Sequence, residues 1–411
     1  MPTDPLRRSS LETVLDVAFT EQAFTASMAM EHTGLTRSTV HAACEELVRL
    51  GWITALDDAR TAGEYRLGRP AKRYELLPTA GVVVGVDVGQ ARVAAVVADL
   101  RGAVLAHAEG SVRQSGDEVE DRRSAVRRCV AEAVDAAGVP AAPVLVTTVG
   151  VAAPVDAHGR SPREDDGFWY RMNPGFEGAL DGYGEVVVEN DANLAAIAER
   201  ARGAGDSFAA LMSGERFGTG LIVDGVLLRG AHGGAGELRV LNLVEGVGTP
   251  EGLGAACRTL AAEALAAGRI AAGTALARAA EHGVLEAPAV FAAAEDGDAV
   301  AAGIVERLGD RLAKACIVLA SLLDIERVYV AGAIAQPAAA VIAQANAALR
   351  GGAFRPVPEV VASTLGADVV LVGAAQRALD VVREAPLALS LPAGTRWTPD
   401  LTAARRAPGG R

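Results

Sequence analysis

The chain has 411 residues, of which half are apolar, with many alanine and glycine residues and few aromatic ones. This length and composition are typical of a folded α/β protein of two or three domains and exclude a disordered chain. The formal net charge of −12 excludes a protein coated with nucleic acid, although it leaves room for a local basic patch.

The four cysteines are scattered without metal-ligand spacing, which indicates free thiols in a reduced chain. No apolar segment follows the arginines near the N-terminus, and no uncharged apolar run is long enough to span a bilayer. We therefore expect a cytoplasmic protein with no membrane partner.

The first 80 residues have the element order of a winged helix-turn-helix. Helices are predicted from Ser9 or Ser10, over residues 25–32 and over residues 37–50, with Gly34 in the turn between the last two. A helix-turn-helix presents the start of its second helix to the major groove. The polar side chains at that position, which we expect to contact DNA, are Thr36, Arg37, Ser38, Thr39 and His41.

A basic β-hairpin wing is expected over residues 60–75. Its side chains Arg66, Arg69 and Lys72 can lie along the phosphate backbone or enter the minor groove. A helical protein-interaction domain is the alternative, because acidic residues slightly outnumber basic ones before residue 81. The clustering of basic residues in the wing matters more than the net charge of these 80 residues, so we expect operator DNA as the partner. One half-site offers few phosphate contacts, so we expect a dimer to bind.

The stretch over residues 186–193 is the centre of the remaining chain. Three valines at 186–188 indicate a short buried strand, a polar cluster follows at once, and residues 194–199 then indicate a helix. Ligands of open α/β sheets bind beyond the carboxyl ends of strands, where Asp191 can accept hydroxyl hydrogen bonds or act as a base and Asn190 can donate and accept. The alternative is that Asp191 or Asn193 only caps the next helix.

Two similar halves are predicted around this stretch, each a sheet with helices. The first half opens with a strand at 82–88 and has a long helix over 118–137. The second half has a Gly-rich turn at 217–220, a Gly-rich segment that leads to Glu237 and Arg239, and a helix over 299–323. Two such halves imply a cleft between them.

The order helix-turn-helix, Asp-x-Gly, Glu-Asn-Asp-Ala-Asn, Gly-Thr-Gly and Arg-Gly-Ala-x-Gly-x-Ala-Gly-Glu resembles the ROK family of repressors and sugar kinases, from about residue 9 to about residue 382. The resemblance implies a winged helix-turn-helix domain at 1–80 and a two-lobed actin-like ATPase and sugar-kinase (ribonuclease H-like) fold at 81–385. The composition after residue 385 predicts a flexible tail at 386–411. It also implies transcription regulation of carbohydrate metabolism by a repressor, a homodimer or homotetramer, whose operator binding responds to a small carbohydrate-like effector. By the resemblance, Asn190, Asp191 and Glu237 hold sugar hydroxyls, and Asp191 matches the catalytic base of the kinases.

The sequence departs from the kinases of this family in the first phosphate loop. Their Asp-x-Gly-Gly-Thr is replaced by Asp-Val-Gly-Gln-Ala at residues 87–91. Gln90 adds bulk where a phosphate approaches the backbone, and Ala91 lacks the hydroxyl group. We therefore expect no catalytic residue, no cofactor and no enzymatic activity. The alternative is an ATP-dependent sugar kinase with an appended DNA-binding domain.

The family's zinc and sugar ligands are altered as well. Its Glu-x-Gly-His reads Glu-Leu-Arg-Val at residues 237–240, its Pro-Gly reads Pro154-Val155, and residues 242–254 hold no cysteine. Four-coordinate zinc cannot be assembled from these residues, so no metal is expected. Arg239 favours an acidic sugar derivative as the ligand. A salt bridge of Arg239 at the surface or between domains, or a pocket that has lost its ligand, remain alternatives.

Overall fold

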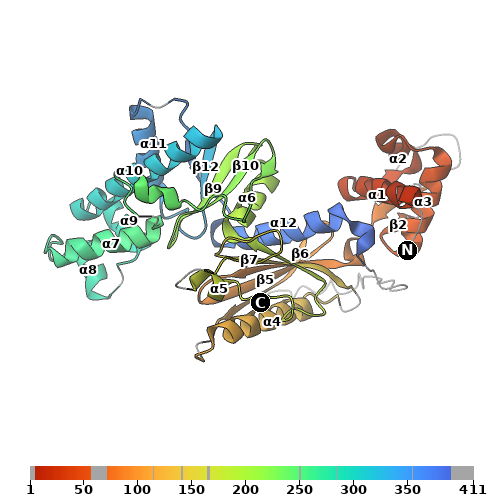
Figure 1. Ribbon diagram of the computed structural model, residues 1–411, viewed down its shortest axis with the longest axis horizontal. Coiled ribbons are helices and arrows are strands. Elements are labelled where there is room, and N and C mark those ends of the chain that lie inside the picture. The colour runs from red at the N-terminus through yellow and green to blue at the C-terminus, as the bar shows by residue number, and fades with distance from the viewer. Residues whose placement is uncertain are drawn as a thin grey trace, which may run out of the picture.

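The computed structural model describes residues 5–56, 72–113, 115–139, 142–163, 167–249, 251–283, 285–353 and 355–389. An N-terminal helical unit lies at one end of the molecule, a first sheet with its helices lies in the middle, and a second sheet with its helices lies at the other end (Figure 1). Arg66 and Arg69 of the expected wing lie outside the described residues, as does the expected tail from residue 390 onward.

The N-terminal unit combines three helices with a small sheet. It contains α1 (Pro5–Thr20), α2 (Ala26–Thr33), α3 (Arg37–Leu50), β1 (Phe24–Thr25), β2 (Ile53–Leu56) and β3 (Arg73–Leu76). In α3 the apolar residues recur at helical spacing, and Val40, Cys44 and Leu47 are fully buried. The predicted hairpin over 60–75 is represented here by β3, whose antiparallel partner is β2, a strand that precedes the predicted start.

Capping groups set the ends of α2 and α3. The Thr25 hydroxyl accepts a hydrogen bond from the Met28 N–H at 3.3 Å, so α2 begins one residue later than the sequence predicted. Gly34 ends α2 in the left-handed conformation, with φ of 68°. The Thr36 hydroxyl then caps α3, as the sequence predicted. The turn between the two helices therefore spans residues 34–36.

The first sheet consists of an antiparallel meander followed by two parallel strands. Its spatial order is β6-β5-β4-β7-β8, formed by β4 (Val82–Val88), β5 (Arg92–Asp99), β6 (Val104–Ser111), β7 (Val144–Val151) and β8 (Glu185–Asn190). The two faces of β4 meet different helices. Val84 and Val86 pack toward α4 (Glu118–Ala136), whereas a Cβ at Gly85 would lie 2.6 Å from the backbone of α12 (Val369–Glu384). A short helix, α5 (Phe168–Met172), precedes β8.

The second sheet repeats the plan of the first. Its order is β11-β10-β9-β12-β13, formed by β9 (Phe208–Met212), β10 (Gly218–Val223), β11 (Val226–Leu227), β12 (Arg327–Ala331) and β13 (Glu359–Ala362). Here too the first three strands are antiparallel and the last two run parallel to the first. The Gly-rich segment predicted as a turn at 217–220 instead enters β10, because Gly218 to Gly220 pair with β9.

Helices cover both faces of the second sheet. One face carries α7 (Leu253–Ala266), α8 (Ala275–Glu281), α9 (Ala287–Glu295), α10 (Ala299–Leu323) and α11 (Ala339–Gly351), which share one apolar core with β9 and β12. The other face carries α6 (Asp191–Ala201), which packs with the start of α12. The α6 and α12 helices therefore lie where the two sheets meet (Figure 1).

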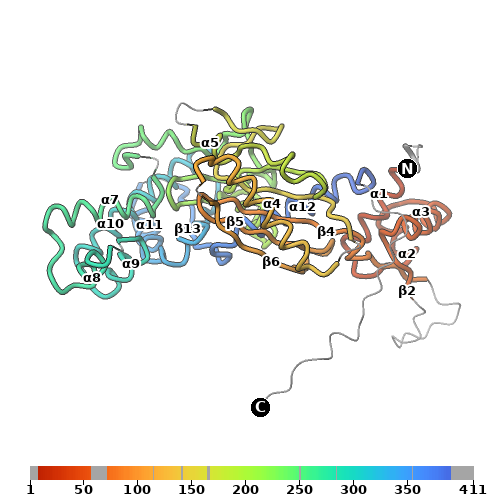
Figure 2. The backbone as a smooth tube through the Cα atoms, turned by 90° about the horizontal axis from the view of Figure 1, so that it is seen from below, coloured from red at the N-terminus to blue at the C-terminus, as the bar shows by residue number. Residues whose placement is uncertain are grey.

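The N-terminal unit is joined to the first sheet by a shared apolar core. Buried residues of α1 and α3 form one cluster with residues of β4, β7 and the end of α12. Ordered structure continues past residue 385, because Leu387 in the short 3-10 helix Pro386–Ala388 is buried in the same cluster. Figure 2 shows α1 beside the end of α12. The position of this unit is therefore set by packing against the lobe and not by a linker alone.

Candidate functional site

Asn190 ends β8 and is held on both sides of its amide. Its Oδ1 accepts from the Asn193 N–H at 3.1 Å, which makes Asn190 the N-cap of α6, and its Nδ2 donates to the Ala153 carbonyl at 3.0 Å. The sequence alternative placed the cap at Asp191 or Asn193. The structure places the cap at Asn190, one residue before Asp191 and three before Asn193, because Asn190 has the extended backbone that a cap requires.

Asp191 is the first residue of α6, and its carboxylate is half-buried beside other acids. Its Oδ1 accepts from the Ala192 N–H at 2.8 Å. Burial raises the pKa of Asp191 to about 7, and the nearby carboxylates of Asp87 and Glu237 add to this rise. Burial also raises the pKa of Asp87 to about 6. The positive charge of Arg92 lowers this pKa, whereas the negative charge of Asp368 raises it further. The carboxylates of Asp87, Asp191 and Glu237 thus face one region between the sheets.

Glu237 reaches this region through a glycine-rich segment that contacts both lobes. A Cβ at Gly233 would lie 1.9 Å from the Val155 carbonyl oxygen, and a Cβ at Gly236 would lie 1.8 Å from that of Thr219. Both glycines have positive φ, so a side chain at either position is excluded by contact and by conformation. The backbone of this segment therefore approaches the backbones of both lobes closely.

Arg239 is exposed and lies over an aromatic ring of the first lobe. Its guanidinium carbon is 4.5 Å from the centroid of the Trp169 ring on α5. This cation–π contact was anticipated neither by the ligand interpretation nor by the salt-bridge alternative. Trp169 lies far from Arg239 in the sequence, so no local pattern could have indicated the pairing.

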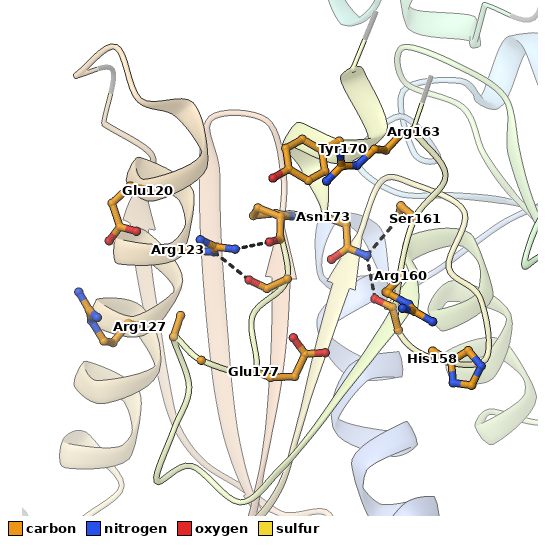
Figure 3. A pocket seen from close by; sticks show the side chains of 15 residues that line it. Glu120, Arg123, Arg127, His158, Arg160, Ser161, Arg163, Tyr170, Asn173 and Glu177 are labelled. Atoms are coloured by element: carbon orange, nitrogen blue, oxygen red, sulfur yellow. Dashed lines mark hydrogen bonds between the residues drawn. The ribbon is translucent and has the colours of Figure 1, made fainter. Parts of the chain in front are cut away.

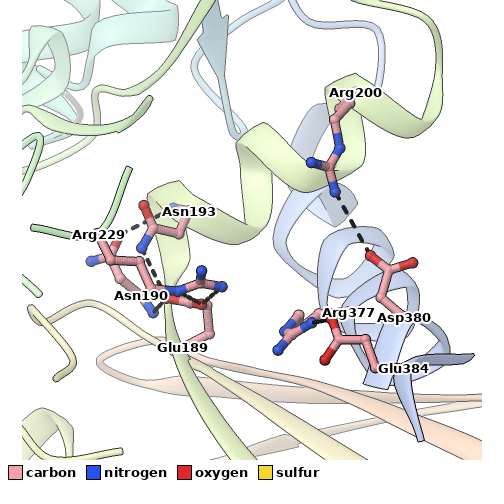
Figure 4. Close-up of polar contacts among 8 residues, drawn as sticks. All are labelled: Glu189, Asn190, Asn193, Arg200, Arg229, Arg377, Asp380 and Glu384. Atoms are coloured by element: carbon pink, nitrogen blue, oxygen red, sulfur yellow. Dashed lines mark hydrogen bonds and ion pairs between the residues drawn. The ribbon is translucent and has the colours of Figure 1, made fainter. Parts of the chain in front are cut away.

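An ion pair between a buried glutamate and a partly exposed arginine joins the lobes next to Asn190, and the sequence reasoning did not single it out. Glu189, only 4% exposed, accepts from Arg229 Nε at 2.9 Å and from Arg229 Nη2 at 2.7 Å. It also accepts from Asn193 Nδ2 at 2.8 Å. Figure 4 shows this group beside a second one, in which Arg200 of α6 faces Asp380 of α12 and Arg377 donates to Glu384.

The loop that corresponds to the first phosphate loop is a tight turn between β4 and β5. The Gly89 N–H donates to the Arg92 carbonyl at 2.9 Å. Beneath the turn, the guanidinium of Arg122 from α4 donates to the carbonyls of Gly89 at 2.6 Å and Gln90 at 3.2 Å. These donors of Arg122 are committed to the protein backbone. The exposed Gln90 side chain occupies the tip of the turn, which fits a phosphate poorly.

The predicted DNA-contacting residues meet at the start of α3. The Thr36 hydroxyl lies 3.1 Å from the Ser38 hydroxyl and 2.8 Å from the Thr39 hydroxyl. Thr36, Arg37 and Ser38 are exposed, and Thr39 and His41 are partly exposed. Lys72, directly before β3, is exposed, and its Nζ lies 5.4 Å from the centroid of the Tyr74 ring.

No metal site is visible among the described residues. No group of three or more histidine, cysteine, aspartate or glutamate side chains there is arranged to hold a metal ion. All four cysteines are buried and free, and burial raises their pKa. These residues do not fit a structural zinc site. No helix among the described residues is both long and apolar enough to cross a membrane.

The duplicated sheets, with carboxylates between them, define a two-lobed α/β protein of the sugar-kinase type. The chain belongs to the ROK family, which it matches over residues 83–381. It is similar to a glucokinase of Streptomyces coelicolor, at 28% identity over 74% of this chain and 98% of that protein. It is also similar to a glucokinase of Halalkalibacterium halodurans, at 32% identity over 37% of this chain. That match spans about half of the length of the relative, 49%.

The solved structures that resemble this one include a regulator and a kinase. A ROK family transcriptional regulator, a homolog of the E. coli MLC protein, superimposes with a TM-score of 0.71 at 17% identity, over 92% of this chain and 97% of that one. A ROK family glucokinase from Streptomyces griseus, in complex with glucose and AMPPNP, gives a TM-score of 0.57 at 26% identity, over 73% of this chain and all of that one. The chain is thus similar both to a regulator and to kinases.

Proposed function

We propose that this chain is a DNA-binding transcriptional regulator, a repressor, whose operator affinity changes when a sugar-derived polyol binds between the lobes. We divide it into a winged helix-turn-helix at 1–80, an effector-binding part from residue 81 that includes the buried 3-10 helix Pro386–Ala388, and a tail after it. The observation that carries the proposal is the N-terminal unit, whose capped α3 exposes hydroxyl and cationic groups while its core is shared with the first lobe. The broad fold likeness to a regulator, over 92% of the chain, supports it.

DNA contact would use the start of α3 and the wing. Exposed Arg37 and Ser38 stand at the positive end of the helix, where base edges and phosphates are reached. Lys72, with Arg66 and Arg69, would lie along the phosphate backbone. One such surface makes few phosphate contacts, so we propose that a homodimer or homotetramer binds a two-part operator.

The effector would bind at the carboxylates of Asp191 and Glu237. A half-buried carboxylate accepts hydroxyl hydrogen bonds, and each such bond to a charged group contributes about 1.5–3 kcal/mol when water is excluded. Asn190 contributes differently from what its sequence position suggested, because its amide is bound to Ala153 and Asn193. It would hold Asp191 in place at the start of α6. Arg239, stacked on Trp169, would border the same region.

Two helices in direct contact, α6 and α12, connect this region with the N-terminal unit. The α6 helix begins at Asp191 and touches α12 backbone to backbone, since a Cβ at Gly373 would lie 1.9 Å from the Leu194 carbonyl oxygen. At its other end, α12 places the Arg383 guanidinium carbon 5.5 Å from the ring centroid of Phe19 in α1. A ligand that shifts α6 would therefore shift α12 and the DNA-binding unit, to the extent that it prefers one of the two states.

DNA binding is tested with the full chain on fragments of the genome it comes from. Retarded fragments identify the operator, and Arg37→Ala should weaken operator binding at least tenfold, whereas substitution of the exposed Arg307 of α10 by Ala should not. If no genomic fragment is bound more tightly than random duplex DNA at physiological salt, the regulator proposal fails.

The effector is tested by a thermal-shift screen of sugars, amino sugars, sugar phosphates and uronic acids. A true effector raises the melting temperature of the wild type, does so much less for Asp191→Ala, and changes the operator affinity. A compound that stabilises both proteins equally does not bind at Asp191.

A sugar kinase is the second candidate, and the pKa of Asp191 favours it. A carboxyl group with a pKa of about 7 is suited to act as a general base near neutral pH. The similarity to Streptomyces glucokinases supports this candidate, whereas the Gln90 turn opposes it. A coupled assay of ATP consumption with a panel of hexoses separates the two. If the wild type consumes ATP with a hexose and Asp191→Asn does not, the protein is a kinase. If the wild type shows no such turnover, the regulator proposal stands.

A further inference from the structure

A cavity of about 910 Å³ opens on the first lobe, away from the carboxylates at the lobe interface. One wall is α4, with Arg123 and Arg127, and the opposite wall is the loop over residues 158–163. The segment that includes Asn173 and Glu177 forms the floor (Figure 3). None of Asp87, Asp191 and Glu237 lines it, so any ligand here would be separate from the proposed effector.

The described lining is cationic in a chain that is acidic overall. Four arginines and one histidine line the cavity against two glutamates, in a chain of net charge −12. Two of the arginines are already positioned by the protein. Arg123 donates to the carbonyls of Pro174 and Gly175, and the Arg163 guanidinium carbon lies 4.8 Å from the ring centroid of Tyr170. Arg127 and Arg160 are exposed at the two sides of the opening.

The floor holds an unused hydrogen-bond acceptor. Asn173 is 5% exposed, and its Nδ2 donates to the Gly159 carbonyl and to the Ser161 hydroxyl, both at 3.0 Å. These bonds fix the orientation of the amide. Its Oδ1 is buried and has no hydrogen-bond donor among the described residues. Figure 3 shows this oxygen turned from Ser161 toward the side of Arg123 and Glu177. An unpaired buried acceptor costs about 1–3 kcal/mol, which a donor from a ligand would recover.

We propose that this cavity binds a small polyol that carries an acid group, either a phosphate or a carboxylate. The guanidinium of Arg127 on one wall or of Arg160 on the other holds the oxyanion, because a single guanidinium group binds phosphate or carboxylate with paired hydrogen bonds. Glu177 and the Oδ1 of Asn173 accept from hydroxyl groups of the polyol. A neutral sugar lacks the first interaction, and a bare inorganic anion lacks the second.

The cavity is also connected with Asn190 through one loop. The Ser161 hydroxyl, which binds Asn173, donates to the Pro154 carbonyl at 2.7 Å. The neighbouring Ala153 carbonyl accepts from Asn190. A ligand bound to Asn173 therefore contacts the same loop that holds the start of α6.

Calorimetric titration of the full chain tests the proposal with four probes at constant ionic strength: glucose 6-phosphate, glucuronate, glucose and inorganic phosphate. We expect the phosphate ester or the uronate, or both, to bind at least tenfold more tightly than glucose and inorganic phosphate. The paired substitution Arg127→Gln with Arg160→Gln should weaken that binding at least tenfold. Arg269→Gln with Arg307→Gln, which removes the same charge from exposed sites on the second lobe, should leave the affinity unchanged.

Two single variants complete the test. Glu177→Gln removes a negative charge from the lining and should tighten the binding of inorganic phosphate several-fold, a gain that a folding defect cannot produce. Asp191→Asn should leave binding of the acidic polyol unchanged. The proposal is overturned if no acidic probe binds, if the arginine pair and its control bind equally, or if Asp191→Asn removes the binding. In that last case the ligand belongs to the lobe interface, and the effector proposal stands without this one.

Discussion

At the scale of single residues, the burial of carboxylates between the lobes has the clearest effect on stability. Burial raises the pKa of Asp191 to about 7 and that of Asp87 to about 6. In both cases the folded protein binds a proton more tightly than the unfolded chain. Each ionised carboxylate therefore costs stability near neutral pH, and a ligand that donates hydrogen bonds to it offsets that cost.

We predict that Asp191→Asn stabilises the protein at pH 8 more than at pH 5. Below the unfolded pKa of 3.8 the wild type carries no penalty, and the penalty grows as pH rises toward about 7, where it becomes complete. The gain in unfolding free energy from the substitution should therefore be larger at pH 8 by about 2 kcal/mol. Urea denaturation at both pH values measures it, with exposed Asp296→Asn as the control. Equal gains at both pH values would mean that Asp191 titrates normally.

At the scale of elements, two contacts help to fix the position of one lobe relative to the other. The first is the ion pair between buried Glu189 of β8 and Arg229 from the loop after β11. The second is the backbone contact between α6 and α12 at Gly373. The first depends on charge and the second on the absence of a side chain, so they can be tested independently.

Removal of the Arg229 side chain should destabilise the protein by about 2 kcal/mol. Glu189 would then keep the Asn193 amide and the Asn190 N–H as donors but would lose its counter-ion, which is costly for a buried charge. Arg229 itself is partly exposed, which moderates the loss. The matched control is Arg258→Ala, whose pairs with Glu215 and Glu286 are exposed and should contribute less than about 1 kcal/mol. Similar effects of both substitutions on the unfolding free energy would contradict this assignment.

Gly373→Ala should separate α6 from α12. The added Cβ would meet the Leu194 carbonyl oxygen at 1.9 Å, so the helices must move apart, at a cost of about 1–3 kcal/mol or more. Gly303→Ala in the interior of α10 meets nothing within 4 Å and should stabilise its helix by up to about 1 kcal/mol. Thermal or urea unfolding of both variants checks the opposite signs. A neutral Gly373→Ala would show that the helices are not in tight contact.

At the scale of the whole molecule, the N-terminal unit is fixed to the first lobe by polar contacts as well as by the shared core. Arg101, in the turn between β5 and β6, donates to the carbonyls of Phe19 at 3.3 Å, Glu21 at 2.8 Å and Gln22 at 3.3 Å. This guanidinium holds the segment that follows α1. A unit fixed in this way moves with the lobe, which a ligand-controlled repressor requires.

Arg101→Ala should loosen this junction without unfolding the lobes. Hydrogen exchange of amides in α1 and β1 should become at least several-fold faster, while amides of β9 and β12 in the second sheet should be unchanged. Arg269→Ala, an exposed arginine of the second lobe, is the control. Exchange that accelerates throughout the molecule would indicate global destabilisation and contradict a local role for Arg101.

Elements with local cues were predictable from the sequence alone. The helix predicted over 299–323 is α10, and the helix predicted over 118–137 ends one residue earlier as α4. The Thr36 cap was also predicted correctly, whereas α6 begins at Asp191, three residues before the helix predicted from residue 194. These features depend on side-chain periodicity and on caps, which act over a few residues, so the chain itself contains the information.

The tertiary structure alone decided what those elements meet. It assigned the cap of α6 to Asn190, which leaves the Asp191 carboxylate facing Asp87 and Glu237. It paired Glu189 with Arg229 and placed Arg239 over Trp169. It also drew Gly218 to Gly220 into β10. Each outcome depends on partners tens of residues away, or across the lobe interface. Because the energies of such contacts arise only when distant segments are packed together, no local pattern in the sequence could specify them.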